Sequence, residues 1–156
     1  MFRTRAVVAV ALAVLSLAAP RPAAAASVQL SLSTASISFP DANPELVPQI
    51  VSTPTPVSVT IQVAGNPGAW QLTVAATGDL QSGADTIPVG NISWTSSVGA
   101  PWLPGSLAVV PPQTVAAGTG NLTPAQTSNL TFRIANLWTF AAGVYTTTAT
   151  FTLFAP

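Results

Sequence analysis

Apolar and polar residues alternate with a period of two along most of this chain, and this limits the folds that it can adopt. Residues 57–63 read Val-Ser-Val-Thr-Ile-Gln-Val, so every second side chain is apolar. Residues 144–153 alternate in the same way, with mostly threonine on one side and Tyr145, Ala149, Phe151 and Leu153 on the other. This is the period of a β-strand with one buried face, and no long helical stripe accompanies it. The pattern predicts an all-β protein.

Similar short segments recur around Leu30, Ile37, Leu72, Trp94 and Phe132, and clusters of Gly, Pro, Asn and Ser separate them. We expect about eight to ten short strands, a number and spacing typical of a single antiparallel β-sandwich of the immunoglobulin-like type. The turn sequence Asn-Pro-Gly at 66–68 predicts a hairpin between the strands on either side of it. Residues 77–90 predict a long connection with one short strand near Ile87.

The first residues have the layout of a secretory signal peptide. Arg3 and Arg5 precede an apolar run from Ala6 to Ala19, and small residues follow up to Ala26. The run is shorter than the roughly 20 residues that span a bilayer. We expect cleavage after Ala26 or Ala25, which divides the chain into a leader, 1–26, and a single domain, 27–156. The protein is then secreted, to the extracellular space or the cell surface, and its Ala-rich leader is of a bacterial kind.

Loss of the leader changes the charge of the protein. Arg133 is the only basic residue after position 26, and the same part of the chain has four carboxylates. One positive and four negative charges give residues 27–156 a net side-chain charge of −3. Those carboxylates are Asp41, Glu45, Asp79 and Asp85. Nucleic acids and anionic membranes attract clustered Lys and Arg, so neither is an expected partner.

Several residue types that carry chemistry do not occur in the sequence. It contains no His and no Cys, and all four of its basic residues are arginines. The commonest general base, the thiol nucleophile, the Schiff-base amine and the usual zinc ligands are therefore missing. We expect a protein that is not an enzyme and has no cofactor, no metal and no disulfide.

Two pairs of carboxylates are candidates for a metal site or a pair of catalytic acids. Asp79 and Asp85 bracket a Gly-containing loop, but calcium needs more oxygen ligands than two carboxylates give, and Asp in loops commonly caps turns. Asp41 and Glu45 stand four residues apart without a neighbouring polar cluster, so solvated loop charges are the better interpretation.

Four tryptophans are candidates for a carbohydrate-binding platform. Trp70 and Trp94 are in phase with apolar strand neighbours, which predicts core positions. Trp102 lies in a Pro- and Gly-rich loop and is the candidate ligand contact, because the loop favours its exposure. Trp138 precedes the last strand and is expected to plug one end of the sandwich.

The last residues, "AAGVYTTTATFTLFAP", resemble the closing strand of bacterial secreted sandwich domains of the spore coat protein U-like, WxL-type and pilin-like families. The segments "WQLTVAATGDL" and "IPVGNISWT" are similar to parts of the same surface proteins. The resemblance implies a structural or cell-surface role. The resemblance to WxL-type domains also implies peptidoglycan binding, but the second Trp-x-Leu of such domains is not evident in "NLWTF" or "PWLPG".

Tyr145 has a structural interpretation of its own. A tyrosine near the start of a late sandwich strand can bury its ring and donate its hydroxyl to a nearby backbone carbonyl, as in a tyrosine corner.

The long uncharged closing strand leaves two alternatives open. The strand is paired within its own sandwich, or an extended segment of one subunit completes the sheet of the next. The candidate donor is the segment after the leader, through its alternating apolar residues Val28, Leu30, Leu32, Ile37 and Phe39. We expect a coat, sheath or filament subunit that binds copies of itself or other surface proteins. A module that binds cell-wall glycans is the alternative.

Overall fold

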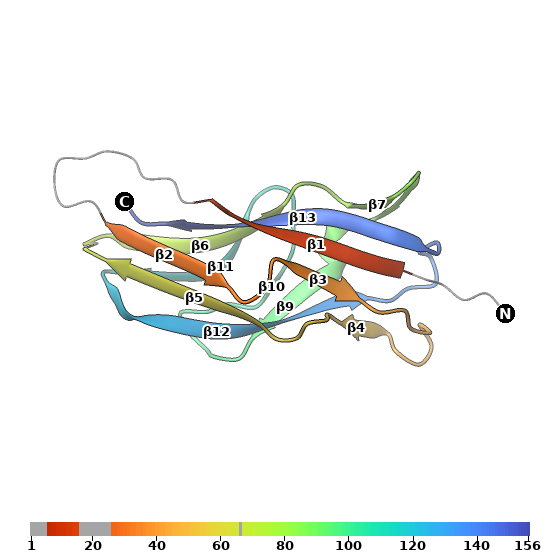
Figure 1. The fold of residues 1–156 in the computed structure, drawn as a ribbon, viewed down its shortest axis with the longest axis horizontal. Coiled ribbons are helices and arrows are strands. Elements are labelled where there is room, and N and C mark those ends of the chain that lie inside the picture. Colours follow the sequence, from red (N-terminus) through yellow and green to blue (C-terminus); the bar gives the residue numbers. More distant parts are fainter. Residues whose placement is uncertain (1–5, 16–25, 66) are drawn as a thin grey trace.

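A computed structural model of the chain describes residues 6–15, 26–65 and 67–156 (Figure 1). These residues form two β-sheets packed face to face, which confirms the predicted all-β sandwich. The arginines of the predicted leader lie at residues 1–5 and 16–25, outside the described residues. The predicted cleavage site, after Ala25 or Ala26, lies at the edge of the described residues. Of the predicted leader, the structure describes Ala6–Leu15 and Ala26.

One sheet has seven strands, and its main path runs β11-β6-β13-β1-β3. The strands of this path are β1 (Ala6–Leu15), β3 (Ser36–Phe39), β6 (Ala69–Ala76), β11 (Gln113–Thr119) and β13 (Gly143–Phe154). A small hairpin of β7 (Leu80–Ser82) and β8 (Asp85–Ile87) is attached through β7 to β13. The connection predicted at 77–90 thus holds two strands where one was expected, followed by a 3₁₀ turn at Val89–Asn91.

The other sheet has six strands, in the order β10-β9-β12-β5-β2, with β4 paired to β12. Its strands are β2 (Ser27–Leu32), β4 (Gln49–Val51), β5 (Val57–Ala64), β9 (Ile92–Ser96), β10 (Gly105–Ser106) and β12 (Leu122–Ala135). The described residues contain more strands than expected because β4, β7 and β10 are only two or three residues long. Such short strands are too brief for alternation to reveal them.

The hairpin predicted around residues 66–68 is wrong. β5 pairs with β2 and β12 in one sheet, whereas β6 pairs with β11 and β13 in the other. The chain crosses between the sheets here, and Gly65 takes a left-handed conformation with φ of 69°. Both strands bury alternate residues completely, so each faces the same core from opposite sides.

The core between the sheets is made of the residues that the alternation predicts. Val57, Val59, Ile61 and Val63 of β5 are all fully buried. From the facing sheet come residues such as Leu72, Val74 and Phe151, also fully buried. Trp94 and Phe132 are register partners on β9 and β12, with ring centroids 6.4 Å apart. Among the described residues no buried side-chain nitrogen or oxygen lacks a hydrogen-bond partner.

Candidate functional site

The feature of the fold that bears most on function is the position of β1 between β13 and β3 (Figure 1). β1 pairs with β13 in parallel over ten residue pairs, from Ala6↔Gly143 to Leu15↔Thr152. On its other side β1 pairs antiparallel with β3, from Val8↔Phe39 to Ala11↔Ser36. A segment of the predicted leader thus occupies a place inside the seven-stranded sheet. We call this place the β3–β13 slot.

Core residues form the walls of the β3–β13 slot. On β13, Tyr145, Ala149, Phe151 and Leu153 are buried, and on β3 Ile37 and Phe39 are buried. Both walls therefore face the interior with large apolar side chains. A strand in this slot separates the core from solvent as well as supplying backbone hydrogen bonds.

The register of β1 shows which residue pattern matches the β3–β13 slot. Val8 is paired with both Tyr145 and Phe39, and Val10 is paired with Thr147 and Ile37. Leu12 and Val14 continue the series, and alanines stand at positions 9, 11 and 13 between them. Val8 is therefore in register with the buried Tyr145 and Phe39, and Val10 is in register with the buried Ile37.

Other edges of the seven-stranded sheet are covered within the chain. Along β11, Leu103 donates its N–H to the Val115 carbonyl at 2.8 Å, and Ala117 donates to the Pro101 carbonyl at 3.2 Å. The outer side of β3 is bridged by Ser38 and Thr53, which exchange backbone hydrogen bonds of 2.8 and 2.7 Å. Such covering removes backbone groups on which another chain could add.

β13 is paired differently on its two sides. On the side away from β1, its second half pairs with β6 from Ala149 to Phe154, and Thr146 pairs with Gln81 of β7. On the slot side, β1 alone is its partner among the described strands. The backbone of the first half of β13 is therefore the part of the molecule most dependent on the occupant of the slot.

The predicted donor residues fall into two groups. Val28, Leu30 and Leu32 lie in β2, half-buried, at the edge of the six-stranded sheet, where β5 is their partner. Ile37 and Phe39 lie in β3, where they belong to the core and to the wall of the slot. As donors to another chain, Ile37 and Phe39 would have to leave their own core, so the donor prediction is retained for the β2 residues alone.

Tyr145 lies at the entry of β13 and joins it to the preceding loop. Its side chain is fully buried, and its hydroxyl donates a hydrogen bond of 3.0 Å to the carbonyl of Ala141, four residues upstream. This is the geometry that the tyrosine-corner interpretation predicts. Burial raises the pKa of the Tyr145 hydroxyl, and the nearby carboxylate of Asp85 raises it further.

The expected exposure of Trp102 is wrong, because only 3% of the residue is accessible. Its backbone bridges to Ala116 of β11, which folds the loop back over the sheet edge and turns the indole into the core. Trp70 and Trp94 are buried as predicted. Trp102 therefore has no free ring face for a sugar, and the basis for naming it a ligand contact is lost.

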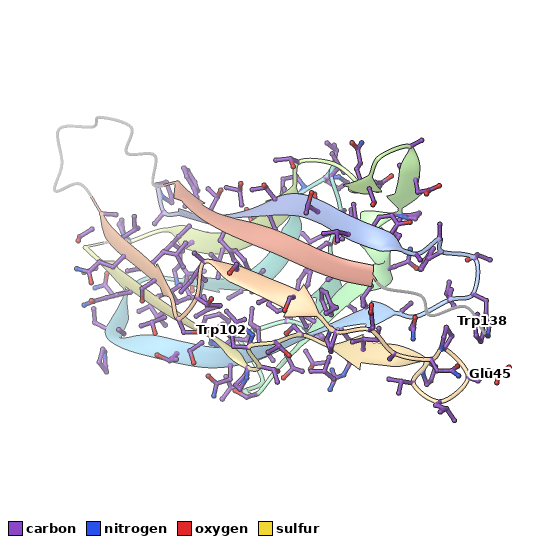
Figure 2. All side chains as sticks on the ribbon, turned by 45° about the vertical axis from the view of Figure 1, so that its right-hand side comes forward. Glu45, Trp102 and Trp138 are labelled. Carbon is purple, nitrogen blue, oxygen red and sulfur yellow. The ribbon has the colours of Figure 1, made fainter. Side chains whose placement is uncertain are left out.

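Trp138 was expected to plug the sandwich, and this is also wrong, because it is 61% exposed. Figure 2 places Trp138 and Glu45 at the same end of the molecule, on two different loops, and Trp102 away from that end. Periodicity gives no information about such loop residues. Only the position of Trp138 outside any alternating segment could have indicated exposure.

The hydrogen bonds around Asp79 and Glu45 are local ones that involve the backbone. Asp79 accepts a hydrogen bond of 2.8 Å from the N–H of Val89 and so fixes the turn after β8. Near Glu45, the side chain of Asn43 accepts the Glu45 N–H at 2.9 Å. Within the described residues, no group of three or more His, Cys, Asp or Glu side chains could hold a metal ion.

Comparison with known proteins adds no relative. No family model matches the chain, and no curated protein is significantly similar to it. In the part of the chain that the structure describes, there is no helix long and apolar enough to cross a membrane.

Proposed function

We propose that this protein is a secreted, non-enzymatic structural subunit of the bacterial cell surface, such as a coat, sheath or filament protein. Its subunits join by β-strand addition, in which one chain supplies a strand to the sheet of another. The β3–β13 slot is the acceptor site of this assembly. The observation that carries the proposal is that β13 has β1 as its only described partner on the slot side.

Removal of the leader would empty the β3–β13 slot. When residues 6–15 leave with the leader, β13 loses ten register pairs and β3 loses four. Two strand edges then stand open beside apolar walls that include Phe151 and Phe39. Unpaired backbone groups and uncovered apolar surface both cost free energy, so the processed domain gains from binding a replacement strand.

The segment after the leader fits the part of the replacement. Val28, Leu30 and Leu32 repeat the alternation of β1, with Gln29 and Ser31 between them. In its own domain this segment forms only an edge strand, held by β5. Moving it to a second copy therefore costs a single strand pairing, whereas moving any central strand costs two.

The non-enzymatic part of the proposal rests on composition. A chain without His, Cys or Lys has few ways to activate a nucleophile or transfer a proton near neutral pH. Four carboxylates remain after position 26: Asp41 and Glu45 in the β3–β4 loop, Asp79 just before β7, and Asp85 at the start of β8.

The experiment is a mass measurement on the exported, processed protein. Light scattering during size exclusion, with negative-stain microscopy of the same sample, should show fibres or discrete oligomers. Deletion of residues 27–33 should give a monomer whose circular dichroism spectrum is still that of a folded β-sandwich. A matched control exchanges Gln29 and Ser31 for threonine, which keeps the apolar positions and should preserve assembly. A processed wild-type protein that stays monomeric at all concentrations contradicts the proposal.

The exposed ring of Trp138 favours a second candidate, a module that binds cell-wall glycans. A single aromatic ring offers one stacking face, which makes this the weaker candidate. Pull-down on purified cell wall, compared between the wild-type protein and Trp138→Ala, tests it directly.

A further inference from the structure

Exposed apolar side chains gather at one end of the sandwich. Leu46 is 79% exposed, Trp138 61%, Leu137 46% and Val47 38%. These four residues come from the β3–β4 loop and the β12–β13 loop, and we call them the end patch. Figure 2 shows Trp138 of one loop at the same end of the molecule as Glu45, the sequence neighbour of Leu46 in the other loop. Single exposed apolar residues are ordinary, but two neighbouring loops that each present two large ones indicate a contact surface.

The two loops of the end patch are fixed to each other. Asn136 donates its side-chain amide to the carbonyls of Ala42 and Val47, at 3.1 and 2.9 Å. Its backbone N–H donates to the Pro48 carbonyl at 2.9 Å. The exposed side chains are therefore displayed by a braced pair of loops, so little order has to be gained when a partner binds.

The end patch borders the mouth of the β3–β13 slot. β3 ends at Phe39 and leads directly into the first loop, while the second loop leads directly into Gly143 at the start of β13. The register pairs Ala6↔Gly143 and Val8↔Phe39 place the first residues of β1 at the same end. A strand that occupies the slot and continues past this end emerges beside the two loops.

We propose that the end patch receives the body of a second copy of this chain, whose β2 segment fills the β3–β13 slot antiparallel to β13. The inference rests on the proposed function and adds the polarity of the assembly. The processed chain begins at Ser27, so the body of the donor can only follow its strand on the carboxyl side. An antiparallel donor places that body at the end patch, whereas a parallel donor places it at the opposite end, beside Phe154.

The distribution of exposed apolar residues selects between these two polarities. At the end where β13 stops, Phe154 is 54% exposed. The end patch has four such side chains on braced loops. The contact must also be mainly apolar, because residues 27–156 contain a single Arg and no Lys to form ion pairs.

The four side chains that define the end patch are apolar, and only the indole N–H of Trp138 among them can donate a hydrogen bond to a sugar. The side-chain amide of Asn136, beside the same loops, is already engaged by two loop carbonyls. Saccharides are recognised by ring stacking together with several hydrogen bonds, whereas another protein surface can cover an apolar patch without them. A second copy is therefore the occupant that this surface fits best.

The first test compares assembly of exported, processed variants. The double variant Leu46→Ser/Trp138→Ser should raise the dissociation constant of assembly about tenfold or more, because large aromatic anchors dominate such contacts. Val110→Ser, at a residue 82% exposed on another loop, is the matched control and should assemble like wild type. Unchanged melting temperatures show that all variants fold.

The outcomes separate the two proposals. Normal assembly of the double variant overturns the end-patch contact and leaves strand addition intact. Loss of assembly in Phe154→Ser with normal assembly of the double variant assigns the parallel polarity instead. Monomeric wild-type protein overturns both proposals. Loss of cell-wall binding by Trp138→Ser without any effect on assembly assigns the surface to a glycan and overturns the contact.

Fluorescence gives a second readout of the contact. Trp70, Trp94 and Trp102 are buried, so acrylamide should quench mainly the emission of Trp138 in the monomer. As protein concentration rises and subunits join, this quenching should fall toward that of the Trp138→Ser variant. Quenching that stays constant while the mass rises contradicts the proposal.

Discussion

Among single residues, Tyr145 shows how the end of the chain is fixed in place. Its ring is part of the core, and its hydroxyl holds the loop that precedes β13. The wall of the β3–β13 slot thus begins at a residue that is anchored from two directions. Because it is the only tyrosine in the chain, its contribution can be measured in isolation.

Removal of the Tyr145 hydroxyl should weaken the domain modestly. In Tyr145→Phe the ring remains and the hydrogen bond to Ala141 is lost, which should lower the free energy of unfolding by about 1 kcal/mol in urea denaturation. Because the pKa of Tyr145 is raised in the folded state, the unfolded state releases its proton first as pH increases. The stability of the wild type should therefore fall above pH ~10, the ordinary range of tyrosine. An equal alkaline loss in Tyr145→Phe would contradict this assignment.

Two glycines are required because tryptophan rings lie over them. Gly118 is the register partner of Trp70, and Gly105 is the partner of Trp94. A Cβ added at Gly118 would lie 2.6 Å from Cζ2 of Trp70, and one at Gly105 would lie 2.6 Å from Cζ2 of Trp94. Each indole thus covers the backbone of the neighbouring strand, a contact that any side chain on the glycine would prevent.

Gly118→Ala should therefore lower the free energy of unfolding by about 1–3 kcal/mol, the usual cost of overpacking. The matched control is Gly99→Ala, because a Cβ at Gly99 would have no heavy atom within 4 Å. Urea denaturation of both variants is the measurement. Equal stability of the two variants would show that the ring of Trp70 moves aside at little cost.

At the level of strands, the sequence predicts well which face of each strand is buried, but it predicts poorly which strands pair with each other. Alternation identified the buried side of β5, β6 and β13, because a period of two depends only on each strand itself. It could not show that β5 and β6 belong to different sheets, since a turn sequence fits a crossing between sheets as well as a hairpin. Pairing depends on residues far away in the chain.

The candidate site shows the same division. The length and lack of charge of the last strand predict that it needs a partner, and the segment after the leader is the predicted donor. That the slot lies between β3 and β13 follows only from the register of β1. The exposed Trp138 and the buried Trp102 could not be predicted, because loops have no period and their packing is set by distant strands.

A strand attached after β13 should fill the slot within one molecule. Joining a short Gly/Asn turn and a copy of Ser27–Leu32 to Pro156 places the added strand antiparallel to β13. The processed fusion should stay monomeric and should melt at a higher temperature than the processed protein without it, because its walls are covered from within. A control in which the three apolar residues of the added copy are serine should behave like the unfused protein. A fusion that assembles as readily as the unfused protein would count against the β3–β13 slot.

Considered whole, the molecule is a sandwich whose seven-stranded sheet is complete only with a strand from the predicted leader. Its low charge and the apolar end patch at the mouth of the slot support the proposed assembly. Assembly by strand addition would bury the open strand edges and the end patch in a single event. The product would be a directional filament, in which every subunit has the same orientation.

Hydrogen exchange of the β13 amides in the processed protein tests this account most directly. If a second copy fills the β3–β13 slot, the slot-side amides of Gly143–Phe154 should exchange quickly in dilute protein and become protected as concentration rises, in step with the mass. Deletion of residues 27–33 should abolish that protection at every concentration. Protection that is already complete in the dilute monomer would contradict the account, because it would show that the slot closes within a single chain.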